Sequence, residues 1–216
     1  ETPNYKEIIK QEYIKCASSC LYFLRKYAFI EHPVRGRINF NLYQFQEVVL
    51  KHFQENNFDI VLKSRQMGIS TLVAGYSLWL MLFHQNRKIL CIATTQNTSK
   101  NMVTKVSFMY KNLPSWLKER NKDGSFAKPQ EDNKLTLKLN NDSEIKATSS
   151  ASDSARSLAV SLLIIDEAAF VDGIEEIWSA AQQTLATGGG AIVLSTPNGT
   201  GNWFHRTWVK AEAREN

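Results

Sequence analysis

The sequence predicts an α/β fold, with a mostly parallel sheet flanked by helices and an N-terminal helical segment. Four apolar runs, 58–62, 88–94, 161–165 and 190–195, have the length of strands and are followed by polar or charged residues. Buried parallel strands are apolar along their whole length, because helices cover both faces of the sheet. Ligands bind at the carboxyl ends of such strands, so the residues that follow these runs form the candidate site.

The composition is typical of one globular unit with a sizeable core. The chain has 216 residues, of which 43% are hydrophobic and 22% are charged. The longest apolar stretch, 72–83, is too short to span a membrane and is expected to form a helix. The three cysteines lack a metal-ligand spacing and are expected to be reduced, and no signal peptide is visible. The net charge of +5 permits a polyanionic partner.

The N-terminal region is expected to be helical. Residues 5–27 carry apolar side chains at helical spacing, which indicates one amphipathic helix packed on the core. Pro33 and Gly36 interrupt this pattern. A second helix is expected over 42–53, leading into the first strand of the sheet.

The middle and the end of the chain contain shorter elements. Segments 134–139 and 143–148 alternate apolar and polar residues around the turn-forming residues 140–142, which favours a hairpin or a pair of edge strands. Residues 120–133 are rich in Lys, Asp, Gly, Pro and Asn, so we expect an exposed loop there. The pattern over 203–214 predicts a C-terminal helix.

The segment 58–71, FDIVLKSRQMGIST, is similar to a phosphate-binding P-loop with a displaced lysine. In the pattern GxxxxGK[ST], backbone N–H groups surround phosphates, the lysine reaches the β- and γ-phosphates and the hydroxyl holds magnesium. Gly68 and Ser70 keep their places here, but Ile69 stands where the lysine is expected. Lys63 opens the loop instead. The alternative is an ordinary strand–loop–helix junction without a ligand.

The apolar run in 161–167, SLLIIDE, ends in two adjacent carboxylates and forms a Walker B pattern. At the end of a buried strand, Asp166 can hold a magnesium shell. Glu167 can then polarise an attacking water, which requires a carboxylate that lies near the γ-phosphate and does not coordinate the metal. The alternative is helix capping, because Asp accepts hydrogen bonds from free backbone N–H groups.

A third polar strand end follows the run 190–195. Ser195, Thr196 and Pro197 lead into a turn at 198–201, and hydroxyls at this place can sense the γ-phosphate. A plain strand-to-turn junction is the alternative, since Pro and Asn-Gly form turns in any protein. Together the three strand ends specify a phosphate cradle, a metal site and a base.

The order and spacing of five motifs resemble those of the ATPase domain of tailed-phage large terminase subunits. The motifs are LYQFQ, KSRQMGIST, SARS, LLIIDEAAF and LSTPNGTGNWF, and the resemblance runs from about residue 40 to the C-terminus. Large terminases are DNA-packaging motors with an additional-strand P-loop NTPase core, and some carry the lysine at the loop opening, as Lys63 is placed here. The resemblance implies a lid or subdomain at 1–40 and an ATPase core at 41–216.

The resemblance also implies roles for individual residues. Tyr43 and Gln44 would recognise adenine by stacking and by reading its edge, although the start of an amphipathic helix is the alternative. Ser70 and Asp166 would hold the metal, and Thr71 would start the helix. The nucleotide would contact the whole loop: Lys63, Ser64, Arg65, Gln66, Met67, Gly68, Ile69, Ser70 and Thr71.

Catalysis would require Glu167, Lys63 and an arginine that neutralises charge in the transition state. Arg156, in the motif SARS, matches a proposed arginine finger that acts on a neighbouring subunit, whereas Arg65 would act within its own subunit. Both alternatives stay open. Ser195, Thr196 and Pro197 would form the coupling motif that links hydrolysis to motion.

The implied function is hydrolysis of ATP with Mg²⁺ to translocate double-stranded DNA into a procapsid. The implied partners are DNA of any sequence, the portal protein, the small terminase subunit and further copies of the chain in a ring, in the host cytoplasm. Large terminases normally continue into a nuclease domain, which we expect to be absent here together with its activity. The alternatives are a superfamily-2-like helicase or remodelling ATPase, and a nucleotide-binding switch that does not hydrolyse.

Overall fold

The computed structural model describes residues 4–118, 127–148, 160–186 and 188–214. A seven-stranded sheet has helices on both faces, which confirms the expected α/β fold with a mostly parallel sheet. The strand order is β3-β9-β8-β4-β7-β6-β5. The strands are β3 (Phe58–Leu62), β4 (Lys88–Ala93), β5 (Glu131–Asp132), β6 (Thr136–Lys138), β7 (Glu144–Thr148), β8 (Leu162–Asp166) and β9 (Gly190–Ser195).

The strands that carry the candidate site are neighbours and run in parallel. β3 pairs with β9, β9 with β8 and β8 with β4, all in parallel, whereas β5 and β6 extend the other edge in antiparallel fashion. In the register, Leu62 lies opposite Ser195 and Asp166 lies opposite Leu194. The residues that follow β3, β8 and β9 therefore meet at one edge of the sheet.

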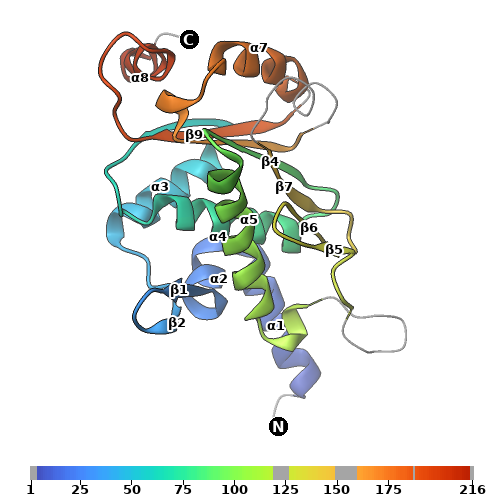
Figure 1. Cartoon of the computed structure of the whole chain (residues 1–216). Coiled ribbons are helices and arrows are strands. Elements are labelled where there is room, and N and C mark those ends of the chain that lie inside the picture. Colours follow the sequence, from blue (N-terminus) through green and yellow to red (C-terminus); the bar gives the residue numbers. More distant parts are fainter. Residues whose placement is uncertain (1–3, 119–126, 149–159, 187, 215–216) are drawn as a thin grey trace.

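Helices cover the sheet in two layers (Figure 1). On one face lie α3 (Gln44–Glu55), α4 (Ile69–Phe83) and α5 (Gln96–Lys111), with α1 (Tyr5–Ser18) and α2 (Cys20–Tyr27) beyond them. On the other face lie α7 (Ile174–Leu185) and α8 (Trp203–Ala213). None of the helices that the described residues form is both long and apolar enough to cross a membrane.

The helix α4 is central to the larger core. Ten of its residues are buried, including Ile69, Leu72, Val73, Leu78 and Met81. Its surface packs against β strands, α2, α3 and α5, which explains why its sequence is apolar on every side and not only on one stripe. The loop before α4 is thus attached to the most deeply buried helix of the fold.

The N-terminal region differs from the single helix expected over 5–27. Ser19 has extended backbone angles, φ −141° and ψ 105°, and separates α1 from α2. Its hydroxyl accepts a hydrogen bond from the N–H of Tyr22 and caps α2, an ordinary role for serine that the apolar periodicity concealed. The expectation of one continuous helix was therefore wrong.

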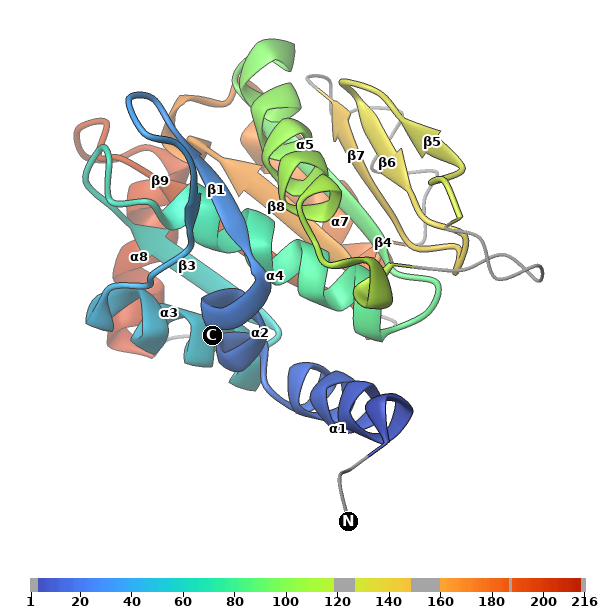
Figure 2. The ribbon, with the colours of Figure 1, turned by 90° about the horizontal axis from the view of Figure 1, so that it is seen from below.

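A hairpin that the sequence did not predict follows α2. It consists of β1 (Phe29–His32) and β2 (Gly36–Asn39), which pair in antiparallel fashion and lie beside α5 (Figure 2). Pro33 and Gly36, which were expected to break a helix, belong to the turn and to the start of β2. The first 40 residues thus combine two helices with a short hairpin.

Other expectations hold with small shifts. The hairpin of β6 and β7 is confirmed, as is the C-terminal helix, and the helix expected over 42–53 is α3 at Gln44–Glu55. The region 120–133, expected as a loop, contains the short strand β5. The helices α5 and α7 were not predicted from the sequence.

The carboxylate of Glu12 joins α1 to α2. It accepts hydrogen bonds from the hydroxyls of Tyr22 and Tyr27 and pairs with Lys26 at 2.9 Å and Lys15 at 3.2 Å. The hydrogen bond from Tyr27, followed by that from Lys26, lowers the pKa of Glu12 to about 2. The ionised carboxylate is therefore the form that fits this corner.

We predict that Glu12→Gln destabilises the fold at neutral pH by about 1 kcal/mol, because the lysines are half-exposed and screened. A carboxyl whose pKa is lowered on folding stabilises the protein above the unfolded pKa, near 4.5, and loses this effect as the pH falls toward 2. Urea unfolding of both forms should therefore show a difference at pH 7 that shrinks below about pH 4.5. A difference independent of pH would contradict this assignment.

Candidate functional site

The loop between β3 and α4 forms a small phosphate-sized cavity. Its volume is about 190 Å³. Gly68 caps α4 with φ +69°, a left-handed conformation that favours glycine, and α4 begins at Ile69, two residues before the expected start at Thr71. The first N–H groups of a helix lack intrahelical partners and attract anions. The cavity is lined by Lys63, Ser64, Gln66, Met67, Gly68, Ile69, Ser70 and Thr71.

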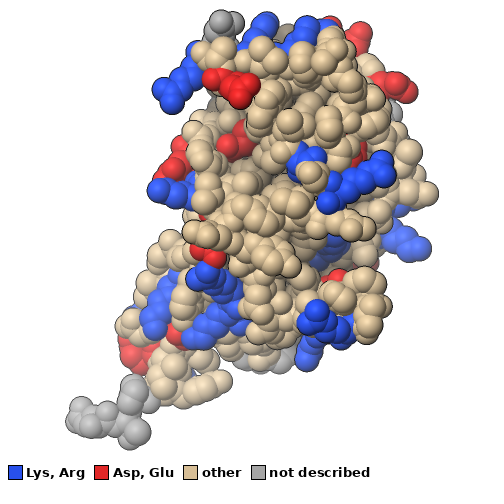
Figure 3. All heavy atoms as spheres, turned by 90° about the vertical axis from the view of Figure 1, so that its left-hand side faces the viewer, with Lys and Arg blue, Asp and Glu red and all other residues tan. Residues whose placement is uncertain are grey.

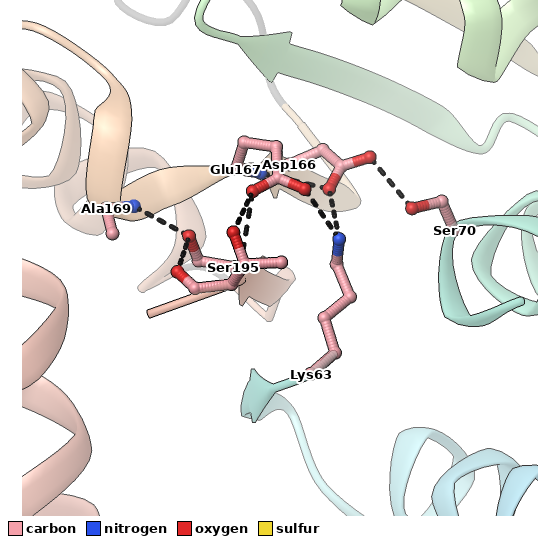
Figure 4. A network of polar contacts seen from close by, with 7 residues as sticks. Lys63, Ser70, Asp166, Glu167, Ala169 and Ser195 are labelled. Carbon is pink, nitrogen blue, oxygen red and sulfur yellow. Dashed lines mark hydrogen bonds and ion pairs between the residues drawn. The ribbon is translucent and has the colours of Figure 1, made fainter. Parts of the chain in front are cut away.

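The displaced lysine reaches the acidic end of β8 (Figure 4). The Nζ of Lys63 lies 2.8 Å from Oε1 of Glu167 and 3.6 Å from Oδ1 of Asp166. The side chain of Lys63 is only 9% exposed, so the charge sits in the site and not in bulk solvent. Although Lys63 stands at the loop opening in sequence, its ammonium group lies where the loop faces the two carboxylates.

Ser70 and Asp166 lie side by side. The hydroxyl of Ser70 donates to Oδ2 of Asp166 at 2.9 Å, so two hard oxygen atoms from different elements meet. Mg²⁺ is usually bound through one or two protein oxygens together with water and phosphate oxygens. This donor set fits Mg²⁺ brought in with a nucleotide, and no group of three or more His, Cys, Asp or Glu side chains able to hold a metal occurs in the described part of the chain.

Glu167 is held in an unusual backbone conformation. Its φ and ψ are 54° and 43°, a left-handed conformation that is costly for a residue with a side chain. The N–H of Glu167 donates to Oδ1 of Asp166 at 2.9 Å. This geometry turns the chain sharply after β8 and directs both side chains toward the loop.

The end of β9 holds the other oxygen of Glu167. Oε2 accepts hydrogen bonds from the hydroxyl of Thr196 at 3.0 Å and from its N–H at 3.3 Å. Burial alone would raise the pKa of Glu167, but the hydrogen bond and charge of Lys63 and the hydrogen bonds of Thr196 lower it below its usual value. Glu167 is therefore ionised at neutral pH, as a base must be.

Ser195 connects the same strand end to two other segments. Its carbonyl accepts a hydrogen bond from the N–H of Lys63 at 3.0 Å. Its hydroxyl accepts one from the N–H of Ala169 at 3.1 Å (Figure 4). Pro197, the next residue but one, is exposed and lines a separate small cavity with Leu62 and Trp208. The end of β9 thus contacts both Lys63 and, through Thr196, the carboxylate of Glu167.

The family model for the large terminase subunit, T4-like virus type, N-terminal part, matches residues 60–216. The chain belongs to the large terminase family. The matched segment contains the loop between β3 and α4, the two carboxylates at the end of β8 and the end of β9.

Solved structures of terminases share the fold. The HK97 bacteriophage large terminase matches with a TM-score of 0.66 and 18% identity, over 92% of this chain and 41% of that one. The ATPase domain of the Thermus phage P74-26 large terminase matches with 0.59 and 22%, over 77% and 68%. The large terminase of a thermophilic bacteriophage, solved in complex with ADP, matches with 0.61 and 15%, over 82% and 44%.

A helicase also shares the fold. The UvsW helicase from bacteriophage T4 matches with a TM-score of 0.59 and 15% identity, over 89% of this chain and 64% of that one. The terminase chain described here spans about two fifths of the length of the complete large terminases that it resembles. The structural likeness shows the fold, and the family model shows the family.

The two residues expected to recognise adenine lie at the start of α3. Tyr43 is 67% exposed, and its ring stacks on that of Phe45 with 5.7 Å between centroids and 8° between planes. Gln44 is exposed and makes no hydrogen bond to the loop in the described structure. Gln46, which the sequence pattern did not single out, does contact the loop. Its position three residues after the helix N-cap is a capping-box spacing that could have marked it.

The two candidate finger arginines differ in where they lie. Arg65 is exposed and does not line the phosphate cavity. Arg156 lies in 149–159, outside the described residues. An arginine finger at either position remains a prediction.

A larger cavity, about 280 Å³, opens at the opposite end of the sheet. Asp59, Tyr76 and Arg87 contribute to its walls, and burial raises the pKa of Asp59 to about 6. It contains none of the residues expected to bind a nucleotide. It is larger than the cavity at the loop, but the free N–H groups of α4, a lysine and two carboxylates converge at the loop, so the smaller cavity is the candidate site.

We predict that Thr196→Val raises the pKa of Glu167, because it removes the hydroxyl donor and keeps the shape of the side chain. Carboxyl carbon NMR shifts followed through a pH titration measure this directly. Thr200→Val, an exposed change in the turn beyond β9, is the control and should leave the titration as in the unaltered protein. An unchanged pKa of Glu167 in Thr196→Val would show that the hydroxyl of Thr196 does not affect this carboxylate.

Proposed function

We propose that this chain is the ATPase motor part of a large terminase, which hydrolyses ATP with Mg²⁺ to move double-stranded DNA into a procapsid. One observation supports this proposal: the loop lacks a lysine at the usual position, but Lys63 lines the same cavity and its ammonium group lies 2.8 Å from Glu167. A cationic side chain placed against the phosphates stabilises the transition state of phosphoryl transfer by several kcal/mol, on the order of other preorganised electrostatic groups.

In this proposal the loop residues bind the triphosphate through backbone N–H groups and the dipole of α4. Lys63 exchanges its contact with Glu167 for one with the phosphates. Ser70 and Asp166 would hold Mg²⁺, which when bound neutralises charge on the phosphate oxygens. Glu167, released by Lys63 but still held by Thr196, orients water and accepts its proton.

The end of β9 is positioned to report the state of the site. Ser195 bonds to the backbone of Lys63 and Ala169, and Thr196 bonds to Glu167. A change in the contacts of Glu167 would therefore act directly on Thr196, which precedes Pro197 and the turn. We propose that Ser195, Thr196 and Pro197 couple hydrolysis to movement in this way.

The proposed partners follow from the family. A packaging motor accepts any sequence, so it requires contacts to the phosphate backbone and not to bases. The net charge of +5 supports a polyanionic partner. Lysine and arginine side chains form several separate groups on the face shown in Figure 3, with acidic side chains between them. The portal protein, the small terminase subunit and further copies in a ring belong to the same proposal, in the host cytoplasm.

A DNA helicase is the second candidate, favoured by the fold that the chain shares with UvsW. A helicase separates the strands of a duplex with a single-stranded overhang, whereas a packaging motor moves along duplex DNA without unwinding it. A strand-separation assay with labelled duplex and ATP distinguishes the two functions.

We predict ATP hydrolysis that requires Mg²⁺ and rises faster than linearly with protein concentration, because an arginine in a ring would act on a neighbour's nucleotide. Steady-state phosphate release over a concentration series measures this.

We predict that Glu167→Gln lowers the rate of ATP hydrolysis by about 10²–10⁴-fold, the size of general-base effects, and that the variant still binds ATP. Hydrolysis at the same rate in Glu167→Gln would contradict the assigned base, and linear concentration dependence would contradict a finger acting between subunits.

A further inference from the structure

Gln46 connects the start of α3 to the phosphate-binding loop. Its side chain is buried, with 2% of the residue exposed. Oε1 accepts a hydrogen bond from the N–H of Tyr43 at 3.0 Å, and Nε2 donates to the carbonyl of Met67 at 2.9 Å. Both ends of the amide are therefore engaged with backbone groups, and neither is directed toward solvent.

Gly68 allows this close contact. A Cβ atom added to Gly68 would lie 2.6 Å from Nε2 of Gln46, closer than real Cβ contacts. Its φ of +69° is also a conformation that side chains disfavour. The glycine thus serves the approach of Gln46 as well as the turn into α4.

The contact with Met67 fixes one peptide plane of the loop. The described residues contain no cis peptide bond, so the carbonyl of Met67 and the N–H of Gly68 point to opposite sides of that plane. Gln46 does not line the phosphate cavity, whereas Met67 and Gly68 do. Because the carbonyl faces Gln46, the N–H of Gly68 faces away from it, and no described residue accepts a hydrogen bond from this N–H.

A glycine at this place makes the peptide easy to turn over, since both signs of φ are accessible to it. The reversed peptide would direct a carbonyl oxygen toward the phosphates and withdraw an N–H donor from them. The carbonyl oxygen would repel an anion, and the withdrawal of the N–H group would remove one of its hydrogen bonds. The orientation of this single peptide therefore affects the binding of any phosphate chain.

We propose that Gln46 is a positioning residue that holds the Met67–Gly68 peptide with its N–H toward the phosphates. It acts through the loop backbone and not on the base, because its amide is buried and both of its ends are hydrogen-bonded to backbone groups. This inference rests on the proposed nucleotide-binding function and adds a residue to it. All ligands that contain the triphosphate depend on Gln46 to the same extent, whatever their base.

The test is the binding of tripolyphosphate, ATP and GTP with Mg²⁺ by titration calorimetry, for Gln46→Glu and Gln46→Ala. Glu keeps the acceptor for the N–H of Tyr43, a favourable capping arrangement, but replaces the donor to Met67 with an oxygen. We expect Gln46→Glu to weaken all three ligands by the same factor, roughly tenfold, the effect of losing about one hydrogen bond. Gln54→Glu, an exposed change on the same helix, should bind all three as the unaltered protein does.

Two results would overturn the inference. If Gln46→Glu weakened ATP alone and left tripolyphosphate unchanged, Gln46 would read the base. If Gln46→Glu bound all three normally while Gln46→Ala did not, Gln46 would only cap α3. Failure of the unaltered protein to bind any of the three would instead overturn the proposed function, and the inference with it.

A second variant reaches the same contact from the loop. Gly68→Ala places a Cβ against Nε2 of Gln46 and should weaken the binding of the three ligands by the same factor. This variant keeps the test available if a substitution at Gln46 alters folding. Thermal unfolding of each variant checks that the fold is retained. A loss in Gly68→Ala that depends on the base would contradict the positioning role.

Discussion

The ion pair between Lys63 and Glu167 is the interaction on which the site depends. It joins the end of β3 to the end of β8 with 2.8 Å between Nζ and Oε1, and the neighbouring Asp166 lies 3.6 Å from the same nitrogen. Two adjacent carboxylates in a partly buried position repel each other unless a cation lies between them. Lys63 supplies this cation, and it already borders the cavity that phosphates would enter.

Ile69 occupies the place at which the usual pattern has the lysine. Ile69 is 4% exposed and belongs to the core cluster that surrounds α4. Its side chain also borders the phosphate cavity, where it contributes packing and no charge. The loop therefore uses its first residue for the charge and its seventh for packing. Position in a motif matters less than where the side chain ends in space.

Much of the fold and of the site could be predicted from the sequence, for physical reasons. Continuous apolar runs identified β3, β8 and β9, and the rule that ligands bind at carboxyl ends brought Lys63, Asp166 and Thr196 together. The prediction of one helix over 5–27 was wrong at Ser19, because the apolar periodicity continues across the break between α1 and α2 and does not reveal the cap. The contact of Gln46 with Met67, 21 residues away, was missed because the capping-box spacing that marks Gln46 indicates only a helix start and not a contact with the loop.

The most direct test of the account is the binding and hydrolysis of Mg²⁺–ATP by Lys63→Ala, beside Lys51→Ala as a control on exposed charge. We expect Lys63→Ala to lower kcat/KM by at least about 10²-fold, the size of losing one preorganised electrostatic group, and Lys51→Ala to hydrolyse ATP as the unaltered protein does. Unchanged hydrolysis in Lys63→Ala would contradict the claim that the displaced lysine carries the phosphate-binding charge.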